Sequence, residues 1–85
     1  MSESAKRVER HSDVDDARIC YWNTEYGWML YIPGCGVGTL GRDHAVIEHE
    51  DGTITVTPSV LMTGHKNGRQ VVRHGFLIKG IWSDC

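Results

Sequence analysis

The stretch over residues 45–72, AVIEHEDGTITVTPSVLMTGHKNGRQVV, decides the fold. It contains two turn signals, Asp51-Gly52 and Asn67-Gly68, and such dipeptides favour the tight turns that close β-hairpins. β-Branched residues are frequent on either side of both turns, and runs of this kind favour strands. We therefore predict two successive hairpins, with strands at 45–49, 54–57, 60–63 and 70–72.

The same pattern continues after this stretch. Lys79-Gly80 separates two short apolar runs, 76–78 and 81–82, and predicts a third tight reversal. Strands that follow one another at such short spacing are typical of antiparallel all-β domains. The predicted fold class is therefore all-β, a small antiparallel sheet built as a meander of hairpins.

Two more strands are expected before this stretch, at 19–22 and 28–32, joined by a turn. In the second of them Trp28, Leu30 and Ile32 fall on one face, because side chains alternate along a strand. The glycine-rich segment 33–38 comes next and is expected to be a loop. Its proline ends the strand, and its glycines permit tight turns around the cysteine between them.

The first 18 residues have a different composition. They carry nearly half of the charged side chains of the chain and few large apolar ones. Such a segment buries too little apolar surface to offset the entropy lost on ordering. We expect residues 1–18 to be a flexible or weakly helical arm and residues 19–85 to be a compact β-domain. A unit of that size often needs a metal, a disulfide or a partner subunit.

Length and charge narrow the classes of function. The chain has 85 residues, with 9 basic and 11 acidic side chains, so it forms one domain and lacks the basic excess of proteins that bind nucleic-acid phosphates. It contains no apolar run near the ~20 residues of a membrane span, and its first residues do not resemble a signal peptide. We expect a cytoplasmic protein with reduced thiols that binds neither nucleic acid nor membrane.

Cysteine and histidine are the side chains that bind zinc most often, and both are frequent here, with three Cys and five His. Cys35 lies in the glycine-rich segment, where the backbone can wrap around a metal. His74 and Cys85 lie on either side of the last reversal, which can bring them to one end of the sheet. The alternative is that the thiols are ordinary packing groups and the domain is held by its core and by homodimerisation.

Several short motifs occur along the chain in a definite order. They are PGCG at 33–36, the Asp-Gly turn, TPSVL at 57–61, the Asn-Gly hairpin, HGFLI at 74–78, and a closing DC. In this order they resemble a family of small phage- and prophage-encoded proteins of unknown function, often misnamed ammonia monooxygenases. The layout is also similar to a small domain of bacterial ubiquitin-like conjugation operons. The resemblance covers roughly residues 31–85.

The resemblance implies a set of zinc ligands. The second cysteine of the family's opening motif corresponds to Cys35, and the histidine of its Cys-His pair corresponds to His74. Two family cysteines are replaced here, the first by Ile32 and the other by Arg73. The closing cysteine and an early histidine complete a predicted Cys2His2 zinc site, made of Cys35, His44, His74 and Cys85.

The remaining cysteine and two other histidines are weaker candidates. His49 lies beside a Glu-Asp-Gly turn and His65 lies beside a lysine, so we interpret both as solvated fallback ligands. Cys20 lies in an expected strand next to a tryptophan, and we expect it to pack rather than to bind metal.

A catalytic interpretation uses Ser59 and His74, which also lie on matched family positions. A serine hydroxyl becomes a nucleophile when a base lies within hydrogen-bond reach and a third group orients that base. Asp84 or Glu48 could orient the imidazole, and the amides around Cys35 could stabilise an oxyanion. The result would be a small hydrolase that trims ubiquitin-like tails. In the simpler alternative the Ser59 hydroxyl only satisfies a backbone group.

The predicted function follows from these points. The three tryptophans and three tyrosines belong mainly in the core, and any that are exposed can anchor a protein interface. We expect a phage-type, zinc-stabilised β-domain that acts as a protein-binding or accessory module on a host or defence protein, through contact rather than chemistry. The Ser59/His74 hydrolase is the alternative, and the two compete because His74 cannot serve both as a ligand and as a base.

Overall fold

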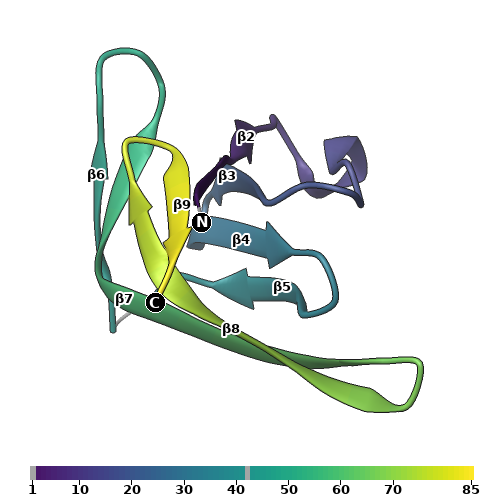
Figure 1. Ribbon diagram of the computed structural model, residues 1–85. Helices are drawn as coiled ribbons and strands as arrows, with labels where there is room; N and C mark the ends of the chain where they lie inside the picture. The colour runs from purple at the N-terminus through teal and green to yellow at the C-terminus, as the bar shows by residue number, and fades with distance from the viewer. Residues whose placement is uncertain (1, 42) are drawn as a thin grey trace.

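The computed structural model describes residues 2–41 and 43–85, and its regular secondary structure is almost entirely strand, which confirms the all-β class (Figure 1). The strands form two sheets that pack against each other. Sheet A has the order β1 (Ser2–Ser4), β9 (Ile81–Asp84), β8 (Arg69–Ile78), β7 (Ile54–Lys66), β6 (Ala45–Glu48). Sheet B has the order β2 (Lys6–Arg7), β3 (Cys20–Thr24), β4 (Gly27–Ile32), β5 (Gly36–Thr39).

The three predicted reversals are confirmed. They join β6 to β7, β7 to β8, and β8 to β9, and each pair is antiparallel. Asn67 and Gly68 both have positive φ, at 53° and 78°, as the tight hairpin turn requires. Lys79 also has a positive φ, 47°, beside Gly80. The turn dipeptides therefore mark the sites where the chain reverses direction.

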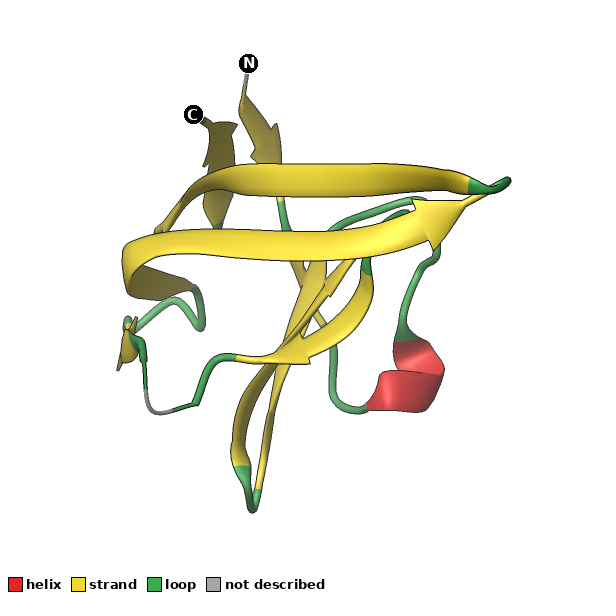
Figure 2. Ribbon diagram, turned by 90° about the horizontal axis from the view of Figure 1, so that it is seen from below, coloured by secondary structure: helices red, strands yellow, loops and turns green. Residues whose placement is uncertain are grey.

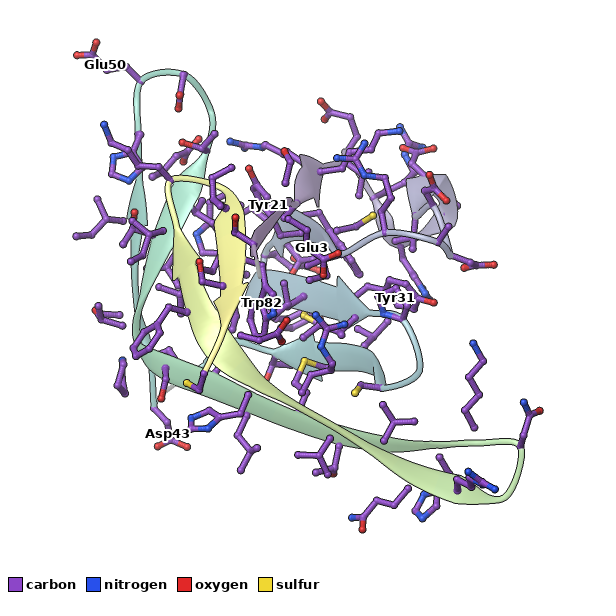
Figure 3. All side chains as sticks on the ribbon, in the orientation of Figure 1. Glu3, Tyr21, Tyr31, Asp43, Glu50 and Trp82 are labelled. Atoms are coloured by element: carbon purple, nitrogen blue, oxygen red, sulfur yellow. The ribbon has the colours of Figure 1, made fainter. Side chains whose placement is uncertain are left out.

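The main core lies between the two sheets. Leu30 and Ile32 of β4 are fully buried there, as the alternation of that strand predicted, together with Trp82 and Tyr21. Figure 3 shows the labelled Tyr21 and Trp82 in the interior between the sheets. Met29 points the other way, into a smaller cluster on the far side of sheet B. Burial of these large side chains supplies most of the stabilisation available to so small a domain.

β7 differs from the prediction because it is one strand, not two. It runs through 13 residues, and the Thr57-Pro58 peptide bond in its middle is cis. The pairing with β8 shifts between Val56 and Val60, which leaves the residues around the proline as a bulge. The strand bends at this bulge, so the β7–β8 hairpin passes beneath sheet B, as Figure 1 shows.

β5 also differs from the prediction, because part of the expected glycine-rich loop is a strand. It pairs with β4 at the edge of sheet B. At Gly38 an added Cβ would come within 3.1 Å of the Met62 side chain on β7. The absence of a side chain at Gly38 therefore allows the edge of sheet B to lie close to the bent hairpin.

The prediction of a flexible or weakly helical N-terminal arm is wrong for the first residues of the chain. Of residues 1–18, residue 1 lies outside the described part of the chain, and residues 2–7 form β1 and β2 rather than a flexible or helical arm. β1 pairs with β9 in sheet A, and β2 pairs in parallel with β3 in sheet B. Ala5 and Val8 are buried, so the backbone pairing needs only small apolar anchors. A short 3-10 turn, His11–Asp13, follows and is drawn in red in Figure 2.

Three contacts of one side chain hold this segment to both sheets. The Arg7 guanidinium donates hydrogen bonds to Glu48 Oε2 at 2.7 Å and to the Gly52 carbonyl at 2.9 Å. It also lies 5.1 Å from the centre of the Trp28 ring. Arg7 is one of the charged residues from which a mobile segment was predicted, and its contacts help to hold this segment to the sheets. Among the described residues, no helix is long and apolar enough to cross a membrane.

Candidate functional site

Ser59 and His74 lie side by side on neighbouring strands, at the bend of the β7–β8 hairpin. A hydrogen bond of 3.0 Å joins Ser59 Oγ and His74 Nε2. In the register after the bulge, Leu61 is opposite His74; Ser59 lies two residues before Leu61 on the same face of β7 and reaches His74 diagonally. The structure thus brings together the two residues of the predicted Ser–His pair.

Two more of the predicted ligands lie next to this pair. The Nε2–H group of His44 donates to the carbonyl oxygen of Ser59 at 3.2 Å. The backbone N–H of Cys85 donates to the His74 carbonyl at 2.8 Å, and the Cys85 side chain is exposed. Two of the four predicted zinc ligands, His44 and His74, therefore contact Ser59, and Cys85 lies beside the backbone of His74.

Cys35 lies elsewhere. Its thiol contacts the carbonyl oxygens of Met62 and Val71, at 3.6 Å and 3.9 Å, and burial raises the pKa of the Cys35 thiol. These contacts are on the side of the hairpin that faces sheet B, whereas His74 lies on the opposite, exposed side. The four predicted ligands therefore do not fit one tetrahedral site. In the part of the chain that the structure describes, no three His, Cys, Asp or Glu side chains are grouped to hold a metal ion.

The two positions where the family has cysteines are used for other contacts here. Ile32 is fully buried in the main core. The Arg73 guanidinium pairs with Glu3 at 2.9 Å and with Asp84 at 3.1 Å, and it lies 5.8 Å from the centre of the Trp82 ring. Apolar packing and an ion-pair network occupy these positions.

The groups that were expected to complete a catalytic site are engaged elsewhere. Asp84 accepts a hydrogen bond from the Trp82 indole N–H at 2.9 Å, and this bond and the Arg73 contacts lower the pKa of the Asp84 carboxyl. Glu48 pairs with Arg7. Neither carboxylate therefore orients His74. The amides around Cys35 lie on the opposite side of the hairpin, so they do not face the Ser59 hydroxyl.

The weaker candidates have local roles. His49 Nε2 lies 2.7 Å from Thr55 Oγ1. His65 lines an open polar hollow with Tyr31 and Lys66. Cys20 is fully buried in the smaller cluster, where it packs as predicted. No other ligand set emerges from these three residues.

One surface feature, the outer face of sheet A, was not predicted from the sequence. We use "outer face" for the strand positions of sheet A whose side chains point away from sheet B. Alternation along the strands assigns these positions, and most of them are exposed. None of these described positions is Asp, Glu, Lys or Arg; they are Ser2, Ser4, Ala45, Ile47, Thr55, Thr57, Ser59, Leu61, Thr63, His65, Gln70, Val72, His74, Phe76, Ile78, Ile81 and Ser83.

The charged residues of these strands all fall on the inner side. They include Arg73 and its partners Glu3 and Asp84, and also Glu48, which pairs with Arg7. The exposed face of an antiparallel sheet normally carries the polar and charged residues. Sheet A therefore has the reverse distribution. The signal is visible in β8 once it is taken as one strand, because its arginines lie at odd positions and its even positions 70–78 are uncharged.

Four large side chains form an apolar patch on the outer face. Ile47, Ile78 and Ile81 are 57%, 54% and 42% exposed, and Phe76 is 44% exposed. The isoleucines lie in one row across the sheet, since Ile78 is opposite Ile81 on β9 and Ile47 is opposite Thr55 on β7. Phe76 lies two residues from Ile78 on the same strand. Contiguous exposed apolar surface of this kind marks interaction sites in folded proteins.

The far side of sheet B carries a second hollow. It is lined by Trp22, Met29 and Tyr26, with the His11 ring stacked on Trp22 at 5.6 Å. Glu9, Arg10 and Glu25 also line this hollow. It therefore carries charged side chains, whereas the described strand positions of the outer face of sheet A include no Asp, Glu, Lys or Arg.

No protein-family model matches the chain, and no significant match was found among curated proteins or solved structures.

Proposed function

We propose that this chain is a small protein-binding module that docks through the uncharged outer face of sheet A. One observation carries the proposal: every charged residue within the strands of sheet A lies on the inner side, and the outer face carries the apolar patch of Ile47, Phe76, Ile78 and Ile81. Charged residues are depleted from the centres of protein interfaces, and aromatic residues are enriched there. The resemblance to phage-encoded proteins adds a role as an accessory module on a host or defence protein.

The electrostatic distribution supports this function because it has no benefit for the isolated domain. Exposed isoleucine and phenylalanine gain nothing from water, and charged residues at the same positions would keep the chain soluble. The chain does carry enough charge, with 9 basic and 11 acidic residues. Those within the strands of sheet A all lie at inner positions; they are Glu3, Glu48, Lys66, Arg69, Arg73 and Asp84. The outer face therefore has the composition of a surface that is covered in use.

Site-specific photo-crosslinking tests the proposal. Phe76 is replaced by a photo-reactive phenylalanine analogue, and the protein is irradiated in a bacterial lysate. We expect a crosslinked protein product that is lost when the same chain also carries Ile78→Asp. The matched control carries the analogue at Tyr26, which is 88% exposed on the turn between β3 and β4. Equal crosslinking at both positions, or none at Phe76, would contradict the proposal.

The alternative function, a Ser59/His74 hydrolase, is favoured by one observation, the 3.0 Å contact between Ser59 Oγ and His74 Nε2. In a hydrolase, His74 would take the hydroxyl proton as Ser59 attacks a carbonyl carbon. The pair has no carboxylate partner among Asp84 and Glu48, which are both engaged elsewhere. A fluorophosphonate probe should label Ser59 and fail to label the His74→Ala variant. Absence of labelling of the wild-type protein would exclude this alternative.

Zinc binding stays a prediction. Cys35 lies across the hairpin from His74, and docking through the outer face of sheet A does not require a bound metal ion. Metal analysis of the purified protein tests zinc binding directly, and the predicted site corresponds to about one zinc ion per chain. Unchanged metal content in the Cys35→Ser variant would show that the predicted four-ligand set is not used.

A further inference from the structure

We infer that the outer face of sheet A docks against a second copy of this chain, forming a symmetric dimer centred on the apolar patch. This inference rests on the proposed function, since it names the partner of the same surface.

The first reason is charge. A two-fold symmetric interface places the same surface of both subunits in contact, so a charged residue near the axis meets a like charge. The outer face of sheet A carries no Asp, Glu, Lys or Arg at its described strand positions. Two copies can therefore meet through it without like-charge pairs. The hollow on sheet B is lined by Glu9, Arg10 and Glu25, which would meet their own counterparts.

The second reason is shape. Phe76 is opposite Ser83 on β9. Alternation places Ala45, on the edge strand β6, on the same face of the sheet. The largest side chain of the face thus has small neighbours within its own surface. When two such faces pack at the usual sheet separation of about 10 Å, large side chains of one copy fit over small ones of the other. The surface is complementary to itself in size as well as in charge.

The third reason is area. The outer face spans all five strands of sheet A, of which β7 has 13 residues and β8 has 10. A face of this size can supply the ~800 Å² per partner of a standard interface. Burial of sheet A on both sides would also explain why its outer strand positions lack charge, as is typical of sheets covered on both faces.

Sedimentation equilibrium of the purified chain, from micromolar to millimolar concentration, tests the inference. We expect the mass of two chains in the wild-type protein. Ile78→Asp should raise the dissociation constant roughly a hundredfold or more, because dimerisation would bury an unpaired carboxylate. The matched control is Tyr26→Asp, which adds the same charge at an exposed position away from the face and should leave the mass doubled.

Two further measurements keep the outcome decisive. Circular dichroism shows whether Ile78→Asp is folded, and Ile47→Asp, at the edge strand, repeats the test if it is not. A monomeric wild-type protein, a variant that dimerises as tightly as wild type, or equal weakening by Tyr26→Asp would overturn the inference. A monomer that still crosslinks from position 76 to a different protein would overturn only the second-copy partner and leave the proposed function standing.

Discussion

Gly64 of β7 lies directly against Cys35 in the turn before β5. A Cβ atom added at Gly64 would come within 2.6 Å of the Cys35 Cα and would also collide with the Gly34 carbonyl oxygen. Both are backbone atoms of the opposite sheet and cannot move aside as a side chain can. This contact fixes how closely the distal half of the β7–β8 hairpin approaches sheet B.

Gly64→Ala should therefore destabilise the protein. Overpacking of this kind lowers the free energy of unfolding by about 1–3 kcal/mol, and chemical denaturation with circular dichroism measures it. Gly41→Ala is the matched control, because its nearest contact would be Thr39 Oγ1 at 3.8 Å. Equal stability of the two variants would mean that the hairpin and the turn are not packed as described.

The carboxyl of Asp84 gives the stability a dependence on acid. The Trp82 indole N–H and the Arg73 guanidinium hold its folded-state pKa below the usual value of 3.8. A lowered pKa contributes stability that is present above the unfolded-state value and is lost as pH falls through the folded-state value. Wild-type stability should thus decline below about pH 4, partly through this group.

The Asp84→Asn variant isolates that contribution. At neutral pH it should lower the free energy of unfolding by on the order of 1 kcal/mol, since charged hydrogen bonds at a partly exposed site are weak. The difference between variant and wild type should shrink as pH falls below 4. Denaturant titrations at neutral and acidic pH provide the measurement, and a difference that stays constant with pH would contradict the assignment.

Arg7 should be more important to stability than its exposure suggests. It joins β2 to Glu48 and Gly52 of sheet A and covers Trp28. Arg7→Ala should lower the free energy of unfolding by about 1 kcal/mol. Arg10→Ala is the control, since its side chain is 75% exposed and its only described ion pair is the 3.7 Å contact with Asp13; it should change stability by less than about 0.5 kcal/mol. If both variants behave alike, the N-terminal segment is not held by Arg7.

The three thiols should react with a disulfide reagent in a fixed order. Cys85 is exposed and should react first. Cys35 is partly buried, and burial raises the pKa of its thiol, so less of the reactive thiolate is present and it should react slowly. Cys20 is fully buried and should react only on unfolding. Stopped-flow absorbance on single Cys→Ser variants assigns each phase, and fast reaction of Cys20 would contradict the packing described.

The sequence predicted the reversals well because turn geometry is local. Asn67-Gly68 and Lys79-Gly80 adopt the positive φ angles that their residue types permit. It failed where long-range contacts override local preference. Gly38 reads as a loop residue, but it lies in a strand because it pairs with Leu30 of β4. The N-terminal segment reads as mobile, but it pairs with the free edges of both sheets.

The site was predicted in part for a related reason. Ser59 and His74 meet because their strands are adjacent, and adjacency follows from the hairpin. Cys35 does not join them because the face on which a side chain lies depends on register, which changes with a shift of one residue. The uncharged outer face was missed because it is a property of five strands together, and β1 and the full length of β7 were not foreseen.

The pairing of β1 with β9 has a mechanical consequence. The two strands run antiparallel with Ser2 opposite Ser83 and Ser4 opposite Ile81, so both chain ends leave the sheet at the same point, as Figure 2 shows. A pulling force applied between the two chain ends would break the β1–β9 hydrogen bonds one after another, rather than load all of them at once in shear. The molecule should therefore yield under tension first by separation of β1 from β9, one residue pair after another.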